Sequence, residues 1–174
     1  MRQLDTLNGR LRIQNCRPLA ARLTFHFGIK LMTHDSTATS ATVAMVEEGD
    51  ATGVVRQIYD DIKATKQIDF VPNFWKTLAH YPPLLEQTWT RLKAVMAPGK
   101  LDSLTKEMIA VAVSVTNGCR YCINSHTAAV QKLGLDQEGL GELMAVVALF
   151  NSTNALADGY LVEPDVRPKP WESP

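Results

Sequence analysis

The stretch of sequence that decides the fold is NGCRYCINSH, residues 117–126. It contains two cysteines separated by two residues, Cys119 and Cys122, and a histidine four residues further on, His126. Gly118 interrupts the apolar segment before the pair, so we predict that a new helix begins at the cysteines. On that helix the three side chains fall at positions i, i+3 and i+7 and therefore share one face.

This placement favours redox chemistry. Helical Cα atoms three residues apart are separated by about 5 Å, which is within the range that a disulfide needs. The first turn of a helix presents unpaired N–H groups and the positive end of the helix dipole, and both favour thiolate over thiol. Cysteines in such positions have pKa values lowered from roughly 8.5 to between about 3.5 and 7.5. The pattern therefore predicts a sulfur that is nucleophilic near neutral pH.

A carboxylate upstream belongs to the same candidate site. Glu107 precedes Cys119 by twelve residues and stands in an apolar stretch. If the two helices pack side by side, its carboxyl group lies near the sulfurs and His126. A partly buried carboxyl has a raised pKa and can transfer protons near pH 7. His126, one turn beyond Cys122, can deprotonate a thiol or pass a proton onward.

Length and composition limit the class of protein. The 174 residues suffice for one domain with a substantial core but hardly for two. With 45% hydrophobic and 21% charged residues and zero net charge, the chain gives no reason to expect nucleic acid or an anionic membrane as a partner. No uninterrupted apolar run reaches the roughly 18 residues of a membrane span. Three cysteines, with Cys16 far from the pair, do not form a secreted disulfide framework, so we expect a cytoplasmic protein.

The chain divides into three predicted parts. Residues 1–31 are rich in arginine and poor in acids, and the segment that begins at Met32 has the composition of a natural disordered N-terminus. We therefore expect residues 1–44 to be an extension that is disordered or not native. Residues 45–163 carry apolar side chains at helical spacing and are predicted to form an all-α domain. The proline-rich residues 164–174 are predicted to be an extended or disordered tail.

We expect a bundle of about six to seven helices. The run over residues 109–115 alternates and is β-branched, as in a strand, but its length back to a cap at Asp102 or Ser103 favours a buried helix. Asp60 and Asp61 are adjacent and indicate a solvated face. Trp75 and Trp89 are predicted to pack in the core or a subunit interface. The expected helices cover residues 54–63, 72–79, 84–97, 102–115, 119–133 and 136–158.

The chain resembles the AhpD-like, carboxymuconolactone decarboxylase superfamily over roughly residues 45–163. A Cys-x-x-Cys alone is weak evidence, but the full spacing of carboxylate, cysteines and histidine inside an all-helical chain is specific. The resemblance rests on Glu107, Cys119, Cys122 and His126, and on VPNF at 71–74, YPPLL at 81–85 and LDSLTKE at 101–107.

The resemblance implies a trimer or hexamer and a thiol-dependent peroxidase for organic hydroperoxides or hydrogen peroxide. Carried over to this chain, Cys122 attacks the peroxide and becomes a sulfenic acid, and Cys119 resolves it to a disulfide. Glu107 and His126 relay protons. No cofactor is expected to be bound, and an external dithiol, a lipoyl group as in AhpD or a thioredoxin-like protein, would reduce the pair. Neither nucleic acid nor a membrane is an expected partner.

Two points depart from a simple transfer of roles. AhpD has a histidine directly before the attacking cysteine, whereas this chain has Tyr121, which is no base near pH 7 without a large pKa shift. The helix dipole by itself would select Cys119 as the more activated thiol, whereas the resemblance selects Cys122. Ser125 is interpreted as a polar helix residue, and it is kept as a secondary site residue, together with Tyr121, because it neighbours Cys122.

Other functions remain open at this stage. A lactone decarboxylase of aromatic catabolism from the same superfamily would not need a redox-active pair, and a non-catalytic redox sensor would be oxidised without turnover. Zinc binding by Cys119, Cys122 and His126 would need a fourth ligand, and three positions along one helix do not readily complete a tetrahedron. Glu107 has a structural alternative as the partner of an arginine or of a helix end.

Overall fold

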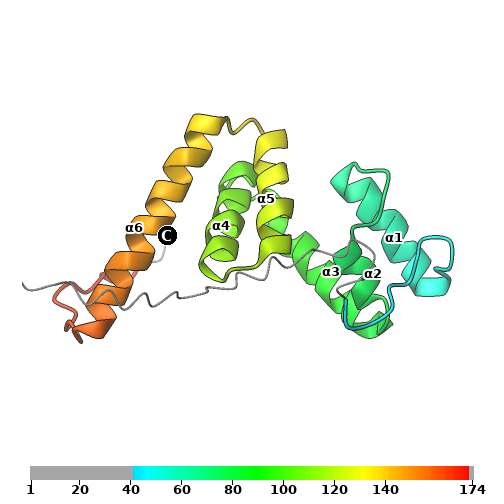
Figure 1. Ribbon diagram of the computed structural model, residues 1–174, viewed down its shortest axis with the longest axis horizontal. Coiled ribbons are helices and arrows are strands. Elements are labelled where there is room, and N and C mark those ends of the chain that lie inside the picture. Colours follow the sequence, from blue (N-terminus) through cyan, green and yellow to red (C-terminus); the bar gives the residue numbers. More distant parts are fainter. Residues whose placement is uncertain (1–40, 173–174) are drawn as a thin grey trace, which may run out of the picture. The chain divides into compact units, whose positions relative to one another are not determined.

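The computed structural model describes residues 41–172, which form six helices and no strand (Figure 1). This confirms the predicted all-α class and number of helices. The predicted N-terminal extension covers residues 1–44, and residues 1–40 of it, Cys16 included, lie outside the described residues. The helices are α1 Gly53–Lys66, α2 Asn73–Leu78, α3 Pro82–Met96, α4 Ser103–Thr116, α5 Arg120–Lys132 and α6 Gln137–Gly159.

Helices α1, α2 and α3 enclose one apolar core. Tyr59 and Ile62 of α1 and Leu85 of α3 are completely buried, as expected from their helical spacing. Trp75 of α2 and Trp89 of α3 are 3% and 2% exposed, and their rings meet edge to face with centroids 5.2 Å apart. Of the two predicted locations, the core or a subunit interface, both tryptophans occupy the core.

Polar contacts fasten the segment before α1 to this core. Tyr59 donates its hydroxyl hydrogen to the carbonyl oxygen of Val46 over 2.8 Å, and burial raises the pKa of Tyr59 to about 12. The carboxylate of Glu48 accepts the N–H of Val71 at 2.8 Å and a hydrogen bond from Lys63 at 3.0 Å. The Val71 N–H, and after it Lys63, hold the pKa of Glu48 below its ordinary value.

Asp61 differs from the sequence-based expectation. It was expected to form a solvated face with Asp60, but its carboxylate accepts the Trp89 indole N–H at 2.7 Å and also binds the Lys93 ammonium. These two hydrogen bonds, with that of Lys93 the larger cause, lower the pKa of Asp61. The carboxylate satisfies the one polar atom of a buried indole, a role that spacing within α1 does not reveal.

Helix α4 packs mainly against α5 and less extensively against α6. The run over residues 109–115 lies within α4, as predicted, and Val111 is fully buried. Asp102 caps α4 by accepting the N–H of Thr105 at 2.7 Å, and Asp136 caps α6 by accepting the N–H of Gly139 at 2.8 Å. Sequence signals at the helix starts therefore explain where these helices begin.

Helix α6 has 23 residues and leaves much of its apolar surface exposed. By length and composition alone it is sufficient to cross a membrane, which the absence of a long uninterrupted apolar run did not predict. Isolated polar and charged residues such as Glu142 interrupt the run without making its average polar. The large apolar side chains of α6 that are most exposed are Val146, Leu149, Phe150 and Leu156, between 52% and 58%.

Candidate redox site

The turn between α4 and α5 places the cysteine pair. Gly118 has φ +68°, a backbone conformation that L side chains rarely adopt, so glycine suits this turn. Cys119 follows as the N-cap of α5, and its N–H donates to the carbonyl oxygen of Ser114 over 3.0 Å. Ser114 is itself buried, and its hydroxyl donates to the carbonyl oxygen of Ala110 over 2.6 Å. The end of α4 therefore fixes the start of α5.

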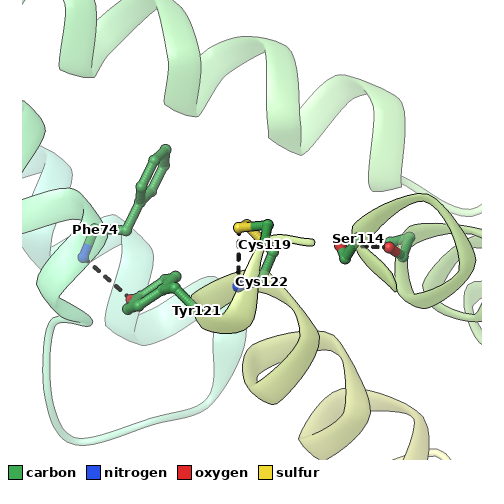
Figure 2. Close-up of a disulfide and its surroundings, with 6 residues drawn as sticks. Phe74, Ser114, Cys119, Tyr121 and Cys122 are labelled. Atoms are coloured by element: carbon green, nitrogen blue, oxygen red, sulfur yellow. Dashed lines mark hydrogen bonds between the residues drawn. A yellow bond between two sulfur atoms is a disulfide. The ribbon is translucent and has the colours of Figure 1, made fainter. Parts of the chain in front are cut away.

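Cys119 and Cys122 form a disulfide across the first turn of α5 (Figure 2). Their Cα atoms are 5.3 Å apart, in agreement with the one-turn spacing predicted for a helix. The sulfur of Cys119 also accepts the N–H of Cys122 at 3.3 Å, so it occupies the place of a capping oxygen. Both cysteines are half-buried.

An imidazole–carboxylate pair lies on the packed faces of α4 and α5. Nδ1 of His126 is 2.6 Å from Oε2 of Glu107, and the two side chains are 27% and 16% exposed. An ionised carboxylate only accepts hydrogen bonds, so Nδ1 then carries the hydrogen and Nε2 carries the free lone pair. Packing of α4 against α5 thus brings together two residues that are 19 positions apart in the sequence. The partner of Glu107 is His126, not an arginine.

Helix α5 carries the cysteine pair and the histidine of the second pair, while Glu107 belongs to α4. His126 lies four residues after Cys122, and side chains four apart on a helix are neighbours. Ser125 is exposed on the same helix. Within residues 41–172, no cluster of three or more histidine, cysteine or acidic side chains is arranged to hold a metal ion. The arrangement provides two sulfurs that can exchange electrons and an adjacent group that can exchange protons.

Sequence reasoning missed a contact of Tyr121. The phenol oxygen accepts the backbone N–H of Phe74 at 3.1 Å, and the two ring centroids are 6.2 Å apart. In the view of Figure 2, Phe74 and Tyr121 lie to one side of the disulfide and Ser114 to the other. Pro72 marks the start of α2 in the sequence, so an N–H group without an acceptor inside the helix can be expected there. The sequence pattern does not show that its acceptor is a tyrosine 47 residues away.

A solved structure with this arrangement of helices provides the decisive comparison. The structure of the alkylhydroperoxidase AhpD core from Rhodospirillum rubrum is 41% identical to the chain and superposes with a TM-score of 0.71. The match covers 73% of this chain and 96% of that one. The chain belongs to the AhpD-like, carboxymuconolactone decarboxylase superfamily. The sequence model of the carboxymuconolactone decarboxylase family matches residues 82–162, a range that includes the cysteine pair, Glu107 and His126.

Curated relatives of the chain differ in their named activities. The alkyl hydroperoxide reductase AhpD of Streptomyces coelicolor is 31% identical over 72 residues, which are 41% of this chain and 40% of that protein. An (R)-2-haloacid dehalogenase of Pseudomonas putida is 30% identical over 106 residues, 61% of this chain and 35% of that protein. The chain thus spans about a third to two fifths of the length of these relatives. Membership in the superfamily therefore establishes the fold but not the reaction, which must be argued from the site.

Proposed function

We propose that the protein is a thiol-dependent peroxidase that reduces organic hydroperoxides or hydrogen peroxide through Cys119 and Cys122. The observation that carries the proposal is the disulfide on the first turn of α5, one helical turn from a histidine paired with a carboxylate. A redox-active dithiol and a proton relay are the two parts that peroxide reduction requires. The similarity to proteins named AhpD supports the same chemistry.

In the oxidative half-reaction, the thiolate of Cys122 attacks one peroxide oxygen. The O–O bond breaks, the sulfur becomes a sulfenic acid and the alkoxide takes up a proton to leave as an alcohol. His126, held by Glu107 through Nδ1, can accept the thiol proton on Nε2 and return it to the alkoxide. We assign the proton relay to this pair, since Tyr121 binds a backbone N–H instead.

The thiolate of Cys119 then attacks the sulfur of Cys122. The S–S bond forms, the S–O bond breaks and the departing hydroxide is protonated to water. The bond that this step forms joins the same two sulfurs as the disulfide in the structure, which supports the proposal. An external dithiol, such as a lipoyl group or a thioredoxin-like protein, restores both thiols by two thiol–disulfide exchanges and becomes a disulfide itself. The cycle needs no bound cofactor because the two sulfurs carry both electrons.

The same superfamily offers a non-redox function. A decarboxylase, or a hydrolase such as the haloacid dehalogenase that the chain resembles, would act without cycling the two sulfurs. The disulfide favours the redox reaction. The two classes are separated by the variant in which both Cys119 and Cys122 are serine, since a decarboxylase or hydrolase would retain activity and a peroxidase would not.

The direct test is anaerobic thiol titration of the reduced full-length protein before and after one equivalent of cumene hydroperoxide. Two thiols per chain should be lost in the wild type, and turnover should appear when dihydrolipoamide or reduced thioredoxin is supplied. Cys122→Ser should abolish turnover, and Cys119→Ser should leave a sulfenic acid that dimedone labels. Cys16→Ser is the matched control and should behave like the wild type. Unchanged peroxide turnover in Cys122→Ser would refute the proposal.

We also propose that the protein is a cytoplasmic homo-oligomer, a trimer or hexamer, in which α6 contacts another copy. The exposed apolar side chains of α6 provide the contact surface, since monomers rarely expose large apolar patches to solvent. Light scattering after size exclusion measures the number of chains. Flotation with anionic vesicles tests the other occupant that the composition of α6 allows, a lipid bilayer. A monomer that floats with vesicles would contradict this assembly.

A further inference from the structure

Tyr121 stands between the two cysteines in the sequence, and its side chain contacts a different helix. Its hydroxyl oxygen accepts the Phe74 N–H at 3.1 Å, and the two rings are tilted by 35° with centroids 6.2 Å apart. Both side chains are about two-fifths exposed, Phe74 at 41% and Tyr121 at 43%. The first turn of α5, which holds the disulfide, is thus fastened to the first turn of α2.

On the α2 side, the contact of Tyr121 is made by Phe74, which packs against the core. The N–H groups at the start of a helix have no acceptor within the helix, so the phenol oxygen supplies one that Phe74 otherwise lacks. The Phe74 ring in turn meets Trp75 edge to face with centroids 5.0 Å apart. Trp75 is 3% exposed and belongs to the core of α1, α2 and α3. Tyr121 therefore connects the sulfur-bearing turn to a buried aromatic cluster.

The disulfide and this contact involve the same turn. The wound turn places the Cα atoms of Cys119 and Cys122 5.3 Å apart, within disulfide range, whereas an extended chain holds them too far apart, and terminal turns are the part of a helix that frays. A side chain anchored in that turn favours its wound form. Because such coupling is reciprocal, an anchor that favours the wound turn favours ring closure between the sulfurs to the extent that the reduced turn unwinds.

We propose that Tyr121 is a positioning residue that keeps the first turn of α5 wound and so promotes formation of the Cys119–Cys122 disulfide. Its place in turnover rests on the proposed peroxidase function: it acts on the resolving step, in which Cys119 displaces hydroxide from the sulfenic acid of Cys122. The attack on peroxide uses the sulfur of Cys122 and not that of Cys119, so the anchor does not accelerate it.

The first experiment measures the dithiol–disulfide equilibrium of the full-length protein in glutathione redox buffers, which requires no peroxidase activity. Tyr121→Phe keeps the ring and removes the hydrogen-bond acceptor. A hydrogen bond contributes about 0.5–1.5 kcal/mol, so the equilibrium constant for disulfide formation should fall roughly two- to tenfold. Tenfold corresponds to a reduction potential about 30 mV less negative for a two-electron couple.

Phe74→Leu probes the same contact from the other helix, because it keeps the backbone N–H and removes the ring pair. It should lower the same constant by a smaller factor, and the double variant should lose less than the product of the two single factors. Tyr160→Phe, at a tyrosine 79% exposed, is the matched control and should leave the constant unchanged. Circular dichroism of each variant establishes that the helices are intact.

The second experiment follows the sulfenic acid after one equivalent of cumene hydroperoxide, by quenching with dimedone. In Tyr121→Phe it should persist several-fold longer than in the wild type, while its rate of appearance is unchanged. Equal equilibrium constants and equal lifetimes in Tyr121→Phe and wild type would overturn the positioning role. If the wild type forms no sulfenic acid, the peroxidase function fails, whereas the glutathione equilibrium still decides the role of Tyr121.

Discussion

The first three helices bury their apolar side chains more completely than the last three do. In α1, α2 and α3 the large side chains meet in one core, with Trp89, Ile62 and Leu85 at most 2% exposed. In α4, α5 and α6 the fully buried apolar side chains are Val111 and Val130, among the residues that the structure describes. A single chain thus buries the core of α1, α2 and α3 and leaves apolar side chains of α4, α5 and α6 exposed. We call these the closed group and the open group. The candidate redox site lies on the open group, whose exposed surface we expect another copy to cover.

The largest expected effect tests the closed core. Trp89→Ala should lower the free energy of unfolding by about 3–5 kcal/mol, because it leaves a cavity and removes the indole that Asp61 binds. Urea unfolding followed by circular dichroism measures the change. Tyr160→Ala, at an exposed aromatic residue, should stay within about 0.5 kcal/mol of the wild type. A loss below about 1 kcal/mol for Trp89→Ala would mean that the first three helices are no better packed than the last three.

The next effect concerns the site on the open group. Glu107→Gln keeps the shape of the side chain but cannot hold the protonated imidazole of His126 as a carboxylate does. Peroxide turnover should fall by about 100-fold, at the lower end of what acid–base groups contribute. Oxidation by diamide, which needs no relay, should still give the Cys119–Cys122 disulfide. Glu86→Gln, on the exposed side of α3, is the control, and equal turnover in both variants would remove Glu107 from the relay.

A third change sharpens the contrast between the two groups. Phe150→Asp places a charge on the exposed apolar face of α6 and should weaken self-association by at least about tenfold, because an unpaired charge is costly to bury in an interface. Val95→Asp introduces the same charge at a residue 59% exposed on α3 and should leave the association state unchanged. Sedimentation across a range of concentrations measures both. Equal effects of the two substitutions would assign no special role to α6.

The smallest expected effect concerns the loss of stability of the closed group, helices α1, α2 and α3, at acid pH. The pKa of Glu48 is lowered in the folded protein, so the unfolded chain binds more protons around the ordinary pKa. The stability from this carboxylate is therefore complete above the ordinary glutamate value and is lost as the pH falls through the lower, folded value. In Glu48→Gln, thermal stability should decline less steeply between pH 5 and about 3 than in the wild type. Parallel declines would show that the Val71 and Lys63 contacts contribute nothing to folding.

Local signals predicted the helices well. Asp102 and Asp136 cap the helices that follow them, and Gly118 adopts the positive φ that separates α4 from α5. The spacing of Cys119 and Cys122 was sufficient to predict that their sulfurs come within reach of each other. These features depend on residues that are near one another in the sequence, where backbone preferences and helix geometry decide the outcome.

Contacts between helices were predictable only in part. The meeting of Glu107 and His126 followed from the assumption that two consecutive helices pack side by side. The bonds from Trp89 to Asp61 and from Phe74 to Tyr121 join residues 28 and 47 positions apart. Such pairs depend on how helices are rotated and tilted against each other, and periodicity within one helix carries no information about that.

The capping role of Cys119 affects what irreversible oxidation of its sulfur does to the fold. Excess oxidant converts a cysteine sulfur irreversibly to a sulfinate or sulfonate, which carries a negative charge. At most positions a new buried charge would destabilise a fold, but here the sulfur already accepts the N–H of Cys122 at a helix N-terminus, where anions are stabilised. Under the proposed cycle, a chain overoxidised at Cys119 would therefore remain folded while lacking the resolving thiol, and its removal would have to depend on something other than loss of structure.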